Sequence, residues 1–237
     1  MRVPLALALL LSCAACSQED APAEKIAETA VEIVAPAAEA TPLAKGPWAP
    51  RDECAEVEGA AQFRQRLAAA IEARDAGALV ALAADDIKLD FGGGAGTAEL
   101  RSRLGDESSE LWEELDALMA LGCSANEQGG ITIPWYFEQE VPGDPFDTFV
   151  VTGENVPMRS APSADAPIVA QVSWDAVAQW RNQTDPDFLQ VRWTDPEGGE
   201  PVEGYIAVNS LRSVIDYRLI ASSRNGRWRI TSLVAGD

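Results

Sequence analysis

The stretch that decides the fold is TFVVTGENVPMRSAPS, residues 148–163. Short apolar runs in it are separated by Gly153 and Pro162, residue types that interrupt strands and form turns. The same pattern continues beyond them, with strand-like runs at 167–172, 188–193 and 204–206, and ends at Leu211-Arg212-Ser213. Residues 148–213 are therefore predicted to form several short strands joined by turns.

In their order, these segments resemble the bacterial SH3 (SH3b) domains, whose opening pattern is Val-Asn-Val-Arg-Ser-Gly-Pro-Ser. The matching residues here are Val156, Met158, Arg159, Ser160, Pro162 and Ser163, whereas Pro157 replaces the usual Asn and Ala161 the usual Gly. The run 188–193 stands at the family's Trp-x-x-Val strand, and Gly204-Tyr205-Ile206 with Leu211-Arg212-Ser213 resembles the closing Gly-Trp-Val…Leu signature. The resemblance covers about sixty-five of the 237 residues and implies a small SH3-like β-barrel over 148–213.

For function, the resemblance implies binding. Relatives of this domain often look like cell-wall-targeting or peptide-binding attachments, with grooves lined by aromatic side chains. The aromatic residues available are Trp174, Trp180, Trp193 and Tyr205, whose rings suit stacking on sugars or packing on peptide side chains. The alternative is that they fill the barrel core, where alternation would place half of them. We expect about two of the four to be exposed.

The C-terminal residues 214–237 predict a β-hairpin. Two apolar runs, 217–221 and 228–234, flank Asn225-Gly226, the strongest short hairpin signal. An isolated two-stranded hairpin is marginal in water. We therefore expect it to join strands near Ile87 and Ile131, which makes one discontinuous α+β domain with the barrel inserted in it.

The block at residues 51–147 predicts helices with a few strands. Apolar residues recur at helical spacing in 59–74 and 109–121, and shorter helices are expected after Asp75 and from Thr97. Residues 87–91 and 131–137 have the character of strands. The glycines of 92–96 invite comparison with a phosphate-binding loop, but their spacing fits none and no lysine follows, so a tight turn is expected.

The four cysteines divide into two groups. Cys54 and Cys123 flank the helical block and predict a structural disulfide, worth on the order of 3–4 kcal/mol in the chain-entropy model. Cys13 and Cys16 lie at the end of a short apolar run that begins after Arg2. Residues 1–16 have the layout of a secretory signal with a bacterial lipobox. Lipidation at Cys16 leaves an even number of cysteines and is preferred, with Cys13 as the alternative.

Residues 17–50, rich in Ala, Pro and Glu, predict a disordered tether that lifts the folded part off the membrane. The formal net charge is −20, which repels the phosphates of nucleic acid and anionic lipid, so neither is expected as a surface partner. The chain has no histidine, so the usual triad base and the commonest transition-metal ligand are missing. No cofactor or metal is expected.

Two functions remain. The first is a lipid-anchored binding or structural module of the cell envelope, an outer-membrane lipoprotein facing the periplasm, whose partner is a cell-wall peptide or an envelope protein. The alternative is an envelope enzyme or small-ligand-binding protein that uses a pocket in the α+β domain, because helices followed by a curved sheet also resemble cone-shaped folds with such pockets. Its candidate acids are Asp85, Asp86 and Asp90. The expected fold class is α+β, with an SH3-like barrel next to or inserted in a disulfide-stapled helix-and-sheet domain after a disordered tether.

Overall fold

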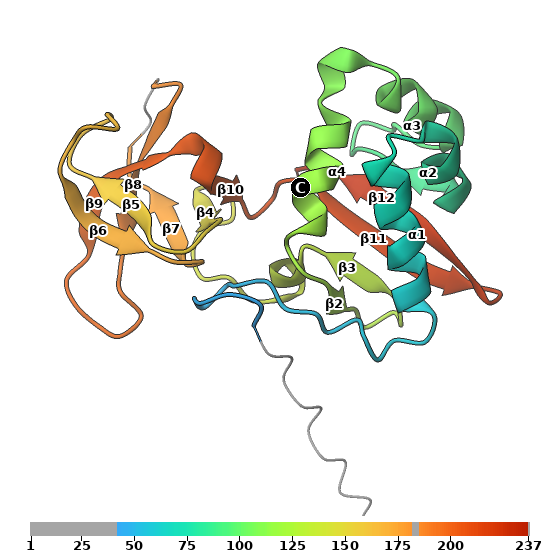
Figure 1. Ribbon diagram of the computed structural model, residues 1–237, viewed down its shortest axis with the longest axis horizontal. Coiled ribbons are helices and arrows are strands. Elements are labelled where there is room, and N and C mark those ends of the chain that lie inside the picture. Colours follow the sequence, from blue (N-terminus) through green and yellow to red (C-terminus); the bar gives the residue numbers. More distant parts are fainter. Residues whose placement is uncertain (1–41, 182–184, 237) are drawn as a thin grey trace, which may run out of the picture. The chain divides into compact units, whose positions relative to one another are not determined.

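The computed structural model describes residues 42–181 and 185–236 (Figure 1). The helices in these ranges are α1 (Ala60–Glu72), α2 (Ala76–Leu82), α3 (Thr97–Leu104) and α4 (Leu111–Met119), with short 3-10 helices η1 (Glu107–Ser109), η2 (Trp135–Glu138) and η3 (Val208–Ser210). The strands are β1 (Ala83–Lys88), β2 (Ser124–Ala125), β3 (Ile131–Ile133), β4 (Thr148–Val151), β5 (Val156–Arg159), β6 (Ile168–Val172), β7 (Ala176–Gln179), β8 (Phe188–Trp193), β9 (Val202–Ala207), β10 (Leu211–Ser213), β11 (Arg218–Arg224) and β12 (Arg227–Val234).

The helices form where the apolar spacing predicts them. In α1 the buried residues Phe63, Leu67 and Ile71 lie one turn apart, so one face of the helix is apolar. Helix α2 begins after Asp75, whose carboxylate accepts a hydrogen bond of 2.9 Å from the backbone N–H of Ala78. This is an N-cap of the usual kind, which satisfies a donor that the helix itself leaves unpaired.

The C-terminal hairpin lies inside a five-stranded sheet of order β1-β12-β11-β3-β2 (Figure 1). Strand β12 pairs in parallel with β1, and β11 pairs antiparallel with β3, with Leu219 opposite Ile133. The hairpin turns at Asn225 and Gly226, which both have positive φ, 54° and 72°. This geometry matches the right-handed twist of the flanking strands. Residues from the end of the chain thus complete a sheet that begins more than a hundred residues earlier.

The helices pack on this sheet and close one core. Leu67, Leu100 and Leu115 from three helices are fully buried together with Ile131 and Ile230 from the sheet. A disulfide joins Cys54 and Cys123, with 5.7 Å between the Cα atoms, and both residues belong to the same core. The helical block is therefore held by burial and by a covalent crosslink at its ends.

The second sheet is made by residues 148–213, in the order β10-β4-β7-β8-β9-β5-β6. Neighbouring strands in it pair antiparallel, for example β8 with β9 from Phe188 opposite Ala207 to Trp193 opposite Val202. Alternating residues of these strands form a small apolar core. Its buried members are Val151, Met158, Val172, Val177, Val191 and Ile206.

The prediction of an SH3-like barrel over residues 148–213 is wrong, and so is the expected fold class that included it. The pairings run as an open series from β10 to β6, and in the part of the chain that the structure describes no ladder joins those two outer strands. Ile168 and Val169 of β6 are 52% and 45% exposed, so this outer strand is uncovered on both faces at that point. Among the described residues, strand residues outnumber helical ones, and the strands form two sheets.

Two further segments differ from the sequence-based expectation. The strand expected at 131–137 ends at Ile133, because Pro134 has no N–H for the ladder, and Trp135 and Tyr136 continue as a buried 3-10 turn. Residues 42–50, expected to be part of the tether, contact the folded chain. Trp48 donates its backbone N–H to the Trp174 carbonyl at 2.8 Å, and its ring lies 6.4 Å from that of Trp135.

Candidate functional site

The four aromatic residues expected to bind a ligand are all half-buried, but they do not share one surface. Trp174 has a φ of 41° and packs against the core of the five-stranded sheet and helices. Its backbone N–H donates to the Gly153 carbonyl and its carbonyl accepts from Trp48, both at 2.8 Å. Trp174 also packs on the small cluster of Trp135, Tyr136 and Val150, so its place is structural.

Trp193 faces inward from β8. Its ring packs on the apolar core of the seven-stranded sheet, beside Val191 and Leu189. Its indole N–H donates a 2.7 Å hydrogen bond to Oδ2 of Asp175. Trp193 therefore positions a carboxylate and leaves little of its own ring for a ligand.

Trp180 and Tyr205 lie on the opposite, outer face of the sheet. Gln190 of β8 is directly opposite Tyr205 of β9, and the backbone N–H of Trp180 donates to the Gln190 carbonyl at 2.9 Å. Opposed residues in neighbouring strands point to the same side. The guanidinium of Arg192, two residues from Gln190, lies 3.0 Å from the Trp180 ring centroid and also pairs with Glu203 at 2.7 Å.

A groove of about 500 Å³ crosses this outer face beside Arg192. The small residues Ala176 and Ala178 of β7 line it, and Ala178 is opposite both Thr148 of β4 and Arg192 of β8. Its walls come from the segments around Trp48 and Pro142. The full lining is Pro47, Trp48, Pro142, Gly143, Thr148, Asp175, Ala176, Val177, Ala178, Arg192, Thr194 and Pro196.

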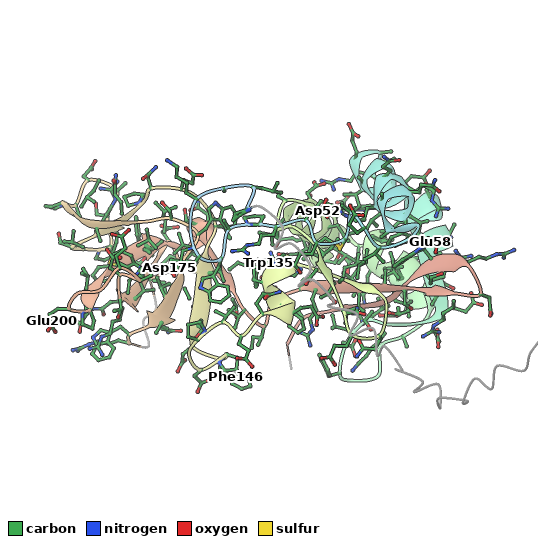
Figure 2. All side chains as sticks on the ribbon, turned by 90° about the horizontal axis from the view of Figure 1, so that it is seen from below. Asp52, Glu58, Trp135, Phe146, Asp175 and Glu200 are labelled. Carbon is green, nitrogen blue, oxygen red and sulfur yellow. A yellow bond between two sulfur atoms is a disulfide. The ribbon has the colours of Figure 1, made fainter. Side chains whose placement is uncertain are left out.

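Asp175, labelled in Figure 2, is one of the residues that line this groove. It is 8% exposed, and its two carboxylate oxygens accept from the Trp193 indole and, at 2.8 Å, from the Ala176 backbone N–H. Burial raises the pKa of the Asp175 carboxyl, and the two hydrogen bonds oppose that shift without cancelling it. A buried carboxyl with a shifted pKa beside a groove is typical of a functional site.

The sequence reasoning missed Asp175, although a signal for it is present. Asp175 directly precedes β7, and Val177 lies two residues further along the chain. Because side chains of a strand alternate between its two sides, both residues are placed on the inner side. An acidic residue in phase with the core is unusual and would have marked the position. Trp48 was also missed, because its segment has the composition of a tether.

The candidate acids of the alternative function do not form a site. Asp85 and Asp86 are exposed, and the Asp86 carboxylate lies 3.4 Å from the Arg224 guanidinium. The Asp90 carboxylate is bound by the Arg103 guanidinium and by the Gly94 backbone N–H at 2.7 Å, and these hydrogen bonds lower the pKa of Asp90. Asp90 therefore closes the glycine-rich turn, which is the structural role expected for residues 92–96.

Other expectations fall partly beyond the described residues. Cys13, Cys16 and residues 17–41 of the expected tether are among the residues that the structure does not describe. Within the ranges 42–181 and 185–236, no helix is long and apolar enough to cross a membrane. In the same ranges, no three His, Cys, Asp or Glu side chains gather as a metal site.

Comparisons with known proteins give a remote likeness. No protein-family model matches the chain, and no curated protein matches it. Among solved structures, the chain is similar to an NTF2-like protein with a cystatin-like fold from Novosphingobium aromaticivorans. The sequence identity is 15%, the match covers 73% of this chain and 75% of that chain, and the TM-score is 0.24. With a TM-score of 0.24 the likeness carries no argument about a ligand or a reaction.

Proposed function

We propose that this chain is an exported binding protein of the cell envelope, anchored by a lipid, that takes a peptide in the groove on its seven-stranded sheet. The observation that carries the proposal is the groove itself, with small residues in its lining, Trp48 on one wall and the Arg192–Trp180 stack beside it. The peptide belongs to the cell wall or to an envelope protein.

The chemistry of the groove suits a peptide. Ala176 and Ala178 let a ligand backbone approach the sheet closely, and the exposed side of Trp48 offers an apolar surface. The Arg192 guanidinium presents hydrogen-bond donors that match a carboxylate. Grooves that combine rigid aromatic walls with a few polar groups are common in peptide recognition.

Export to the envelope is supported by features outside the groove. The signal-like pattern of residues 1–16 is typical of a lipoprotein, and a disulfide between Cys54 and Cys123 is stable in an oxidising compartment. The lipid would hold the chain at the membrane while the folded part meets its partner.

The test is co-sedimentation of the purified full chain with isolated cell-wall sacculi at several salt concentrations. We expect retention that survives salt and falls about tenfold or more for Trp180→Ala, because the Trp180 ring holds the Arg192 guanidinium that lines the groove. Ala178→Phe should abolish retention by filling the groove, since Ala178 is exposed and its substitution leaves the core untouched.

Matched controls separate the groove from the rest of the surface. Phe91→Ala removes a ring that is 48% exposed on the helical half, and Ser223→Phe adds a ring at an exposed position of β11. Both controls should bind as the unmodified chain does. Equal losses in the controls, or no retention at all, would exclude the wall as the ligand of the groove.

A further inference from the structure

A second pocket, of about 370 Å³, lies where the β11–β12 hairpin meets helix α1. Its lining is distinct from that of the groove: Gly59, Gln62, Arg66, Gly226, Arg227, Trp228 and Arg229. Three of these residues are arginines, in a chain whose formal net charge is −20.

Periodicity explains why the arginines converge. Gln62 and Arg66 are one turn apart on α1 and share a face. Arg227 and Arg229 are two residues apart on β12, so they lie on one side of the strand, while Trp228 between them is buried.

Trp228 fixes the hairpin against the start of α1. Its indole N–H donates to the Glu58 carbonyl at 3.0 Å, and its ring stacks on Phe63 with 5.7 Å between the centroids. Glu58, labelled in Figure 2, belongs to the turn that leads into α1. The two sides of the pocket are thereby held together by buried contacts rather than by the arginines.

In the part of the chain that the structure describes, the arginines of this pocket have no acidic partner. Elsewhere in the described chain, Arg64, Arg74, Arg103, Arg192, Arg212 and Arg224 each lie within 4.0 Å of a carboxylate. Among the described residues, no carboxylate lies that close to Arg66, Arg227 or Arg229. Two of these guanidiniums donate to neutral backbone carbonyls. Arg66 donates to the carbonyl of Gln62 at 3.4 Å, and Arg229 donates to the carbonyl of Trp228 at 3.0 Å.

We propose that this arginine pocket binds a phosphoryl group. A guanidinium presents parallel N–H donors that match the oxygens of a phosphate, and several guanidiniums around one pocket favour an anion with more than one negative charge. A phosphoryl group carries that charge, and the pocket volume leaves room for what it is attached to. The ligand is a soluble phosphate ester or the headgroup of an anionic phospholipid, which present the same chemistry.

The acidic net charge of the chain does not prevent such binding. At physiological salt, charges separated by more than about 8 Å are largely screened, so the local arginines set the potential at the pocket. A local cationic pocket on an acidic surface should bind more weakly as the salt concentration rises.

The experiment uses the full chain and two probes. Inorganic pyrophosphate is titrated by calorimetry, and vesicles of one part phosphatidylglycerol to three parts phosphatidylcholine are tested by flotation, with pure phosphatidylcholine as the blank. We expect Arg227→Gln and Arg66→Gln each to weaken binding about tenfold, because each removes a charge-assisted contact. Both side chains are exposed, so the thermal midpoint should not change.

The matched control is Arg101→Gln, which removes the same charge from an exposed position of α3. Binding of pyrophosphate alone identifies a soluble ester as the ligand, and binding of the anionic vesicles identifies a headgroup; either result supports the pocket. The proposal would be overturned if neither probe bound or if citrate bound equally tightly. It would also be overturned if Arg101→Gln weakened binding as much as the pocket variants do. Retention on sacculi by Arg227→Gln, measured alongside, reports separately on the groove.

Discussion

At the scale of single residues, Asp175 is the least expected feature of the molecule. Its carboxyl is 8% exposed in the small core of the second sheet, where an ionised group is costly. The Trp193 indole and the Ala176 N–H offset part of this cost, and the remainder appears as a raised pKa. The groove thus has in its lining a carboxyl that gains a proton more readily than one in water.

The raised pKa of Asp175 predicts a specific pH dependence. The folded chain holds this proton more tightly than the unfolded chain, so the stability that the group contributes is present at low pH and is lost as the pH rises through its folded pKa. Relative to Asp175→Asn, which does not titrate, the unmodified chain should become more stable as the pH falls from 7 to 4. Urea unfolding of both chains at several pH values measures the difference, in which the other acidic groups cancel. A difference that stays constant over this range would contradict the assignment.

At the scale of elements, the β11–β12 hairpin connects the arginine pocket to the fold of the chain. It completes the five-stranded sheet, and it presents two of the three arginines of the second pocket. Its geometry depends on Asn225 and Gly226, which adopt the left-handed conformation that the tight turn requires. The pocket and the sheet therefore depend on the same two turn residues.

Gly226→Ala should destabilise the chain by about 1 kcal/mol, because a Cβ is disfavoured at a φ of 72° even though no atom lies within 4 Å of it. The control is Gly105→Ala, at a φ of −90° in the C-cap of α3, where a Cβ meets only ordinary contacts. Its effect should remain within about 0.5 kcal/mol. Chemical denaturation measures both free energies of unfolding. An unchanged stability for Gly226→Ala would mean that the turn tolerates a different conformation.

At the scale of the whole molecule, residues far apart in the sequence are held together by buried contacts and by the disulfide between Cys54 and Cys123. Arg212 at the end of the second sheet is 7% exposed and pairs with Glu114 of α4 at 3.1 Å, which ties that sheet to the helical block. The disulfide closes a loop with a sequence separation of 69. Fixing two such distant points lowers the entropy of the unfolded chain.

Replacing both cysteines, Cys54→Ala with Cys123→Ala, should lower the free energy of unfolding by about 3–4 kcal/mol. Alanine avoids burying a hydroxyl, since both positions are fully buried. Reduction of the unmodified chain by dithiothreitol should give a similar loss, whereas the double variant should not respond to the reductant. A double variant as stable as the oxidised chain would show that burial alone holds the block.

The sequence by itself determined the local structure of this protein. Helical spacing identified the buried faces of α1 and α4, Asp75 marked the start of α2, and Asn225-Gly226 marked the hairpin. Cysteine counting indicated the pair that forms the disulfide. These features follow from short-range geometry, in which neighbours in sequence are neighbours in space.

Only the tertiary structure decided the architecture of residues 148–213 and the make-up of the sites. The run of strands is compatible with a closed barrel or an open sheet, and the choice depends on whether β10 and β6 meet. The groove brings Trp48 to β7 and β8, and the arginine pocket brings α1 to β12, over separations of more than a hundred residues. Such contacts depend on the packing of whole elements, which no local pattern encodes, and this is why the groove and the arginine pocket emerge only in the folded chain.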